Sequence, residues 1–393
     1  MRDVAFLETA PLSPLGDSVS GRATGVRRLL GRLARGVGSA AGWAFGLVSL
    51  MLGLAVLAST PVLQLLTLGY FLESSARVAR SGRLRDGFIG VRPAARAGGM
   101  ALGTVLAMIP LMLTLGYARS AAIIDPGGPA ERGLRAAAVA VWALTCLHVL
   151  TAYLRGGRLR SFLWPFGGPF WLWRRLKRGR LYAEARDGFW EFVGKFRPLY
   201  YFRLGLVGFL GTVAWLAIPT AMIAATTRFP VLGLIGMILL ACVAPLVPFL
   251  QTGYAVEGKA SALFGRRGAR ERFRHAPWAF AFALFVLLAA SIPLYLLKIE
   301  MVPREAAWLP GLVFVAFLAP ARVLVGWAYA RSLRRERRSH WFFRLFGRLA
   351  IVLVAAVYVL VVFLSQYTSW GGVWSLFEQH AFLMPAPFLT FDR

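Results

Sequence analysis

The sequence has few of the residues that mark a soluble enzyme or a disulfide-stabilised secreted domain. Its 393 residues include 17 acidic residues, four histidines, two cysteines and no asparagine. Cys146 and Cys242 both lie inside apolar runs, which argues against a disulfide framework and predicts buried free thiols. Charged residues make up 16% of the chain and hydrophobic residues 58%, whereas soluble domains are about 45–50% apolar. The composition therefore indicates a membrane protein.

Long apolar runs decide the fold class. A segment of about 20 apolar residues is enough to span a bilayer as a helix, and runs of this kind recur along the chain. They lie at residues 98–117, 136–154, 204–226, 277–297, 309–329 and 349–365, with longer stretches at 40–72 and 231–254. We predict an all-α polytopic membrane helix bundle of about eight membrane elements. The first run begins near residue 40 and is too long for a signal peptide, so we expect insertion by the chain's own helices.

Basic residues are abundant and unevenly placed. There are 45 Lys and Arg residues, which give a net charge of +28, and 31 of the 45 fall in segments 73–97, 155–203, 255–275 and 331–348. The loops between these segments, with the C-terminal tail, hold seven. The positive-inside rule explains this pattern better than a nucleic-acid partner does. We predict that the four segments face the cytoplasm in a multi-pass protein of the bacterial cytoplasmic (inner) membrane.

The region before the first long run raises a question of topology. Residues 1–21 are predicted to be a disordered tail and residues 22–38 a cytoplasmic amphipathic basic helix in the headgroup layer. A single crossing through residues 40–72 would place this arm on the charge-poor side. A hairpin with its tip near Pro61 would return the chain to the cytoplasm, because proline interrupts a helix. The alternative is one long helix kinked at Pro61.

An internal repeat links two parts of the chain. Residues 61–76 align without a gap to residues 245–260, 184 positions later, and chance similarity in a biased sequence is the alternative. The matched pairs include Pro61 and Pro245, Gly69 and Gly253, Tyr70 and Tyr254, and Glu73 and Glu257. Because each copy precedes a basic loop, we predict two parallel membrane repeats with proline-broken helices.

The repeat suggests a division of the whole chain. Residues 39–154 form the first membrane repeat, and residues 155–202 form a cytoplasmic basic and aromatic interfacial linker. Residues 203–366 hold the second repeat with flanking helices. Residues 367–393 form an aromatic tail that lies on, or plugs, the outer face.

The proline-broken hairpin followed by a Gly-Tyr pair and a short basic loop resembles a known pattern. It is similar to bacterial multi-pass inner-membrane families described only as domains of unknown function, and less closely to the sulfate-permease CysZ type. The likeness covers residues 61–73 and 245–257. The second resemblance implies re-entrant hairpins around a solute path.

Polar residues within apolar runs are the candidates for an intramembrane site, because such groups are costly in a bilayer and usually functional. Arg322 is predicted either to bind an anionic solute or headgroup, or to snorkel to the cytoplasmic face. Glu73 and Glu257 are predicted to form structural salt bridges with loop arginines, or else a proton relay. Gln64 and Gln251 are the candidate buried amides.

A second candidate site combines aromatic and basic residues in the linker. Aromatic side chains at the headgroup level beside a polybasic run are typical of binding to anionic lipid, and a plain topology anchor is the alternative. The residues proposed to hold lipid are Trp171, Trp173, Arg174, Arg175 and Lys177.

Catalytic patterns are nearly absent. The four histidines lie in different settings without a metal-binding motif, so we predict no catalytic residues, no metal, no cofactor and no enzymatic activity. The predicted function is a permease-like or channel-like protein for a small or anionic solute. The alternative is a non-transporting scaffold that binds anionic lipids or partner membrane proteins.

Overall fold

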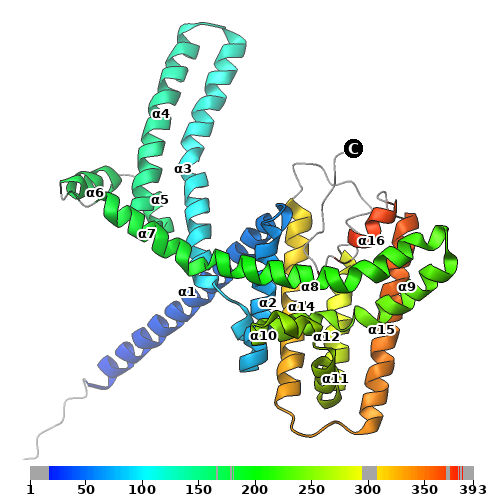
Figure 1. Ribbon diagram of the computed structural model, residues 1–393. Helices are drawn as coiled ribbons and strands as arrows, with labels where there is room; N and C mark the ends of the chain where they lie inside the picture. The colour runs from blue at the N-terminus through cyan, green and yellow to red at the C-terminus, as the bar shows by residue number, and fades with distance from the viewer. Residues whose placement is uncertain are drawn as a thin grey trace, which may run out of the picture. The chain divides into compact units, whose positions relative to one another are not determined.

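The computed structural model describes residues 17–164, 167–177, 179, 181–293, 308–368, 372–378, 380 and 383. Every regular element in this part of the chain is a helix (Figure 1), so the all-α class is confirmed for it. The chain divides into two units, one up to Phe45 and one from Gly46 onward. The first unit contains most of α1, Asp17–Ser59, and the second contains the other elements.

Six helical segments are long and apolar enough to cross a membrane. The bent pair α9, Pro230–Val243, and α10, Val247–Glu257, raises the number to seven if it is one span. These described residues do not confirm the expected count of about eight. One reason is that α12, Pro277–Ala289, is short, and much of the rest of the predicted run 277–297 lies outside the described residues. The six segments are Gly36–Ser59, Val91–Ile124 (α3), Pro129–Leu154 (α4), Tyr182–Thr227, Leu309–Leu333 and Trp341–Thr368 (α15).

The N-terminal region differs from the predicted division. Helix α1 begins at Asp17, inside the segment 1–21 predicted to be disordered, and residues 1–16 lie outside the described part. It continues to Ser59 without a break at residue 38. The predicted amphipathic helix and the first membrane helix are therefore one element, because no proline or turn sequence separates them.

The first predicted break is present. Helix α1 ends at Ser59, residues 60–63 form a turn, and α2 spans Gln64–Ser81. The Thr67 hydroxyl donates to the Leu54 carbonyl at 3.2 Å, whereas in a continuous helix these residues would be about 20 Å apart. The chain therefore reverses near Pro61, as the hairpin interpretation requires, and α2 returns along the end of α1.

The second break has a different geometry. Helices α9 and α10 meet at residues 244–246 with a bend of 42°, and Pro245 is buried. Helix α10 stops at Glu257 because Gly258 adopts a left-handed conformation with φ 71°, which suits a helix C-terminus. The matching position in α2 is Ser74, and that helix continues to Ser81. The two parallel repeats thus remain a prediction, with similar sequences that end their helices differently.

Helix α2 lies in the core of the second unit. Leu68, Leu72 and Ala76 pack with Leu204 of α8, Pro198–Ala224, and with Tyr254 of α10. Helices α2 and α8 cross so closely that a Cβ on Gly69 would lie 1.9 Å from the Tyr201 carbonyl oxygen. The matched helices α2 and α10 meet through this apolar cluster and through a hydrogen bond from Arg80 to the Ala255 carbonyl at 2.8 Å.

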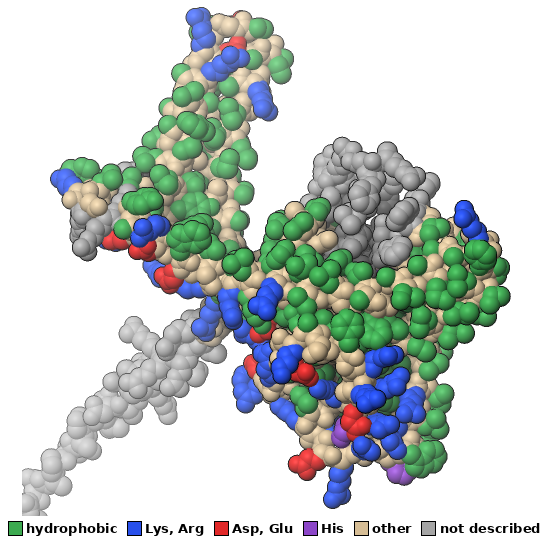
Figure 2. Space-filling model, viewed as in Figure 1, with side chains coloured by type: hydrophobic (Ala, Val, Ile, Leu, Met, Phe, Trp, Pro, Cys, Tyr) green, Lys and Arg blue, Asp and Glu red, His purple; other side chains and the backbone are tan. Residues whose placement is uncertain are grey.

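Helices α3 and α4 pack against each other as an antiparallel hairpin (Figure 1). Hydrophobic side chains cover much of their visible surface (Figure 2), as expected for faces that contact lipid. Cys146 on α4 and Cys242 on α9 are free and exposed. The prediction of buried thiols is wrong, because each cysteine lies on an outward apolar face of its helix and not on a packed one.

The four basic segments contact one another. Arg334 donates to the Ser81 carbonyl at 2.5 Å and Arg338 to the Glu271 carboxylate at 2.8 Å. The linker joins the same network, because the Tyr200 hydroxyl donates to Glu73 at 2.7 Å. The positive-inside prediction requires the four segments to lie on one side of the membrane, and these contacts agree with a common side. Which side that is remains a prediction.

Candidate functional site

The candidate site is a cluster of polar side chains in the interior of the second unit. Its centre is Arg322 on α14, Trp308–Leu333, where only 1% of the residue is exposed. Helix α2 approaches α14 closely near this point. Ser75 of α2 donates to the Arg322 carbonyl at 2.7 Å, and a Cβ on Gly326 would lie 2.3 Å from the Ser75 carbonyl oxygen. A larger residue than glycine would separate the two helices.

The Arg322 guanidinium contacts an amide from another helix. Its Nη1 donates to Gln251 Oε1 at 2.6 Å, and Gln251 Nε2 donates to the Thr212 hydroxyl at 2.6 Å. Gln251 lies in α10, one turn after the proline break, and is fully buried. The cluster thus joins α8, α10 and α14.

The C-terminal segment, of which residues 372–378, 380 and 383 are described, completes the cluster. Gln251 Nε2 donates to the Leu383 carbonyl oxygen at 3.0 Å, and Arg322 Nη2 lies 3.5 Å from the same oxygen. His380 bonds to the Thr220 hydroxyl at 2.9 Å through Nε2 and to the Tyr358 hydroxyl through Nδ1. His380 and Leu383 are fully buried. These described tail residues are packed into the bundle, and the prediction that the tail lies on, or plugs, the outer face stays a prediction.

The structure distinguishes among the predicted polar residues. Snorkelling of Arg322 is wrong, because its side chain turns inward to Gln251. Gln251 is buried as predicted. Gln64 is only partly buried and begins α2 directly after the turn, so it is not a buried amide.

The two matched acids have different surroundings. Glu73 is buried and contacts Arg77 at 3.0 Å, Arg80 at 3.8 Å and the Tyr200 hydroxyl at 2.7 Å. The Glu257 side chain is 43% exposed and pairs with Arg272 at 3.0 Å. Each acid has an arginine partner, which is the geometry of a structural salt bridge.

The matched tyrosines also have different roles. The Tyr70 hydroxyl donates to the Ile89 carbonyl at 3.2 Å and accepts from the Ile89 amide at 3.1 Å. Tyr254 packs among Leu68 and Leu72 instead. Tyr70 thus holds the segment that leads into α3, and Tyr254 holds α10 against α2.

The predicted lipid-binding residues lie on α6, Gly167–Leu176, and just after it. Their charges contact neighbouring rings: Lys177 Nζ lies 3.8 Å from the ring centre of Trp173, and the Arg175 guanidinium lies 5.9 Å from that of Trp171. Arg175 is also paired with Glu184, which reduces its capacity for an anion. Arg174 lies over the Phe170 ring at 4.2 Å. Lipid binding at α6 stays a prediction.

Several members of the cluster were not predicted. Thr212 and Thr220 are weak signals within an apolar run. No sequence pattern predicts the contact between Tyr358 and His380, because one lies in a helix and the other in the tail, and they meet only in the folded chain. The described residues contain no group of three or more His, Cys, Asp or Glu that could hold a metal ion.

Comparison with protein-family models, with curated proteins and with solved structures finds no match.

Proposed function

We propose that the chain is a permease-like or channel-like membrane protein for a small anionic solute, with Arg322 and Gln251 as its binding centre. The helices support the coarser statement, a multi-pass membrane protein. The observation that carries the finer one is the convergence of two donors, Arg322 Nη2 and Gln251 Nε2, on the single carbonyl oxygen of Leu383.

This convergence has the geometry of an oxyanion site occupied by an internal acceptor. A guanidinium presents its donors in a fixed fork that suits carboxylate, phosphate or sulfate oxygens. Placing an arginine at the centre of a membrane helix costs about 3 kcal/mol on insertion scales, so its presence there favours a functional role. If the C-terminal segment withdrew, both donors would become available to a solute oxygen.

The C-terminal segment is accordingly proposed to act as a plug. Leu376, His380 and Leu383 are all fully buried, so these three residues occupy space that would otherwise be open between α8, α14 and α15. The resemblance to the sulfate-permease type agrees with an anionic solute. The proposal assigns no enzymatic reaction and no cofactor.

The test is anion flux in proteoliposomes. Truncation after Gly371 should raise sulfate or phosphate efflux at least tenfold over the full chain. Adding Arg322→Gln to the truncated chain should abolish the increase, and Arg322→Lys should restore only part of it because the fork is lost. Arg348→Gln, an exposed charge on α15, is the matched control and should leave the flux unchanged. A truncated chain that is monodisperse and helical but passes no anion would refute the proposal.

A membrane scaffold is the second candidate, and a specific observation favours it. Two cavities lie around the end of α14, and at the α2–α8 crossing the helices pack closely through apolar side chains and glycine. In this role the residues of α6 would contact anionic lipid. Substituting Arg174, Arg175 and Lys177 together by Gln should then reduce the anionic lipid that co-purifies with the folded protein. Unchanged lipid would leave α6 only as an anchor.

A further inference from the structure

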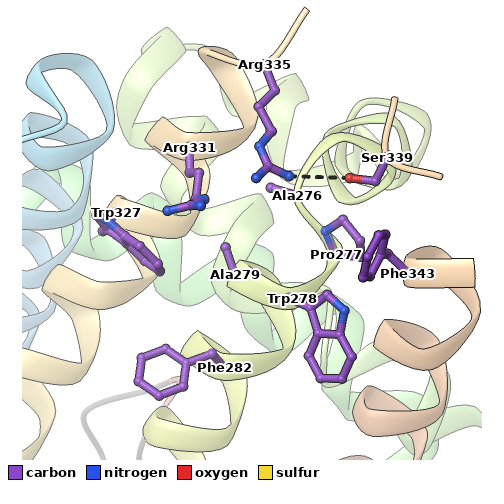
Figure 3. A pocket seen from close by; sticks show the side chains of 10 residues that line it. All are labelled: Ala276, Pro277, Trp278, Ala279, Phe282, Trp327, Arg331, Arg335, Ser339 and Phe343. Carbon is purple, nitrogen blue, oxygen red and sulfur yellow. Dashed lines mark hydrogen bonds between the residues drawn. The ribbon is translucent and has the colours of Figure 1, made fainter. Parts of the chain in front are cut away.

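A pocket lies at the end of α14, apart from the polar cluster. It has a volume of about 360 Å³ and is bounded by the beginning of α12, the end of α14 and the beginning of α15 (Figure 3). A second cavity of about 250 Å³ shares Trp327, Arg331 and Arg335 with it. The two cavities form a groove over the end of α14.

One side of the pocket is cationic. Figure 3 shows the guanidinium groups of Arg331 and Arg335 directed into it. Arg335 is held by hydrogen bonds to the His275 carbonyl at 3.2 Å and the Ser339 hydroxyl at 3.4 Å. Arg331 lies over the Trp327 ring at 5.5 Å. Two guanidinium groups are thus positioned before any ligand arrives.

No acidic residue is among those that line the pocket. The nearby Glu271 already contacts Arg338 at 2.8 Å and Arg274 at 3.1 Å. Among the described residues that line the pocket, none therefore balances the positive charge of Arg331 and Arg335.

The opposite side of the pocket is aromatic and opens outward. Trp278 and Phe282 on α12 are 50% and 51% exposed, and Phe285, nearly one turn further, is 56% exposed. Their spacing of four and three residues places them on one face of the helix, over a length of about 10 Å. Phe343 on α15 also lines the pocket and lies beside Pro277 (Figure 3). A bare inorganic anion would gain nothing from these rings, whereas an acyl chain would.

We propose that this groove binds one anionic phospholipid, with its phosphate between Arg331 and Arg335 and an acyl chain along Trp278, Phe282 and Phe285. The position agrees with the chemistry, because tryptophan is enriched at membrane interfaces and arginines beside it attract anionic headgroups. The site is separate from α6 and does not depend on the proposed transport function. It requires only that α12, α14 and α15 contact the bilayer.

The test is native mass spectrometry of the full chain, titrated with phosphatidylglycerol or phosphatidylcholine. The wild type should hold one phosphatidylglycerol tightly and show no equivalent phosphatidylcholine. Arg331→Gln with Arg335→Gln should weaken that binding about 30-fold, since each basic residue near a headgroup contributes about fivefold. The matched control, Arg337→Gln with Arg348→Gln, removes the same charge from the same basic segment and should change it less than threefold. Equal losses in the two variants would overturn the specific site in favour of general charge attraction.

Two further measurements separate a lipid from a free anion and remain informative if the double variant does not fold. Phe282→Ala should weaken long-chain phosphatidylglycerol but leave the six-carbon analogue unchanged, because only the chain contacts the ring. Inorganic phosphate at 10 mM should not displace the long-chain lipid. Displacement by phosphate, or a Phe282→Ala variant with unchanged long-chain affinity, would refute the lipid site.

Discussion

At the scale of single residues, the matched acids Glu73 and Glu257 show how one motif can have two energetic roles. Glu73 is withdrawn from water and its carboxylate has three partners. A hydrogen bond to a buried charged group contributes about 1.5–3 kcal/mol. Glu257 lies at an open surface with one arginine, where an ion pair contributes about 0–1 kcal/mol.

We therefore expect Glu73→Gln to lower the unfolding temperature in detergent by several degrees and Glu257→Gln to change it little. The physical reason is that the neutral Gln side chain would be buried at this position and could not balance the positive charges of Arg77 and Arg80. Thermal unfolding followed by intrinsic tryptophan fluorescence would measure both variants under one condition. Equal shifts would contradict the assignment of Glu73 as the structural acid.

At the same scale, Val62 carries backbone strain at the first helix break. Its φ is 68°, a left-handed conformation that costs an L-residue about 1–2 kcal/mol. Val62→Gly should therefore stabilise the fold by about 1 kcal/mol, despite the greater chain entropy of glycine. The matched position in the second break is Leu246, with φ −83°. Leu246→Gly should destabilise the fold, and the opposite order in chemical unfolding would be evidence against strain at Val62.

At the scale of elements, the crossing of α2 and α8 determines how the second unit packs. A Cβ added to Gly69 of α2 would lie 1.9 Å from the Tyr201 carbonyl oxygen. A Cβ added to Gly205 of α8 would lie 1.9 Å from the Leu65 carbonyl oxygen. Such close approach of helix backbones depends on small residues. The crossing is reciprocal, so neither helix can shift to relieve a clash without losing the contact of the other glycine.

Gly69→Ala should consequently destabilise the protein by about 1–3 kcal/mol or more, as other overpacked cores do. Gly116 on α3 is the control, because a Cβ there meets nothing within 4 Å. Gly116→Ala should be neutral or stabilising, since alanine is the better helix former. Yield of monodisperse protein and unfolding temperature would report both effects, and a tolerated Gly69→Ala would show that the crossing is looser than described.

At the scale of the whole molecule, the prediction concerns membrane topology. The four basic segments contact one another and are expected to share one side of the membrane with the N-terminal arm. With Cys146 and Cys242 first replaced by Ser, a cysteine at Gly128, in the turn between α3 and α4, should react with a membrane-impermeant maleimide in intact cells. A cysteine at Gly21 should react only after permeabilisation. The expectation follows from the reversal near Pro61 and the positive-inside rule. Labelling of the cysteine at Gly21 in intact cells would place the N-terminal arm on the outer side and contradict this topology.

The sequence by itself determined the class of this protein and the positions of its main helices. Apolar runs near residues 98–117, 136–154 and 349–365 lie within helices of the structure, because bilayer thickness imposes a helix length that composition reveals. Pro61 and Pro245 also marked both breaks, since proline acts locally on its own chain. Gln64 and Gln251 both lie in apolar runs, yet only Gln251 is buried, so this part of the prediction did not follow from the run alone.

Only the tertiary structure decided what these local features become. It turned Pro61 into a reversal and Pro245 into a 42° bend, because the packing around each break differs although the residues match. It directed Arg322 inward to Gln251 and to Leu383 of the C-terminal segment. It also formed the groove at Arg331 and Arg335 from three helices. These contacts join residues far apart in the chain, and pairing of that kind depends on how the helices pack, which periodicity and composition do not record.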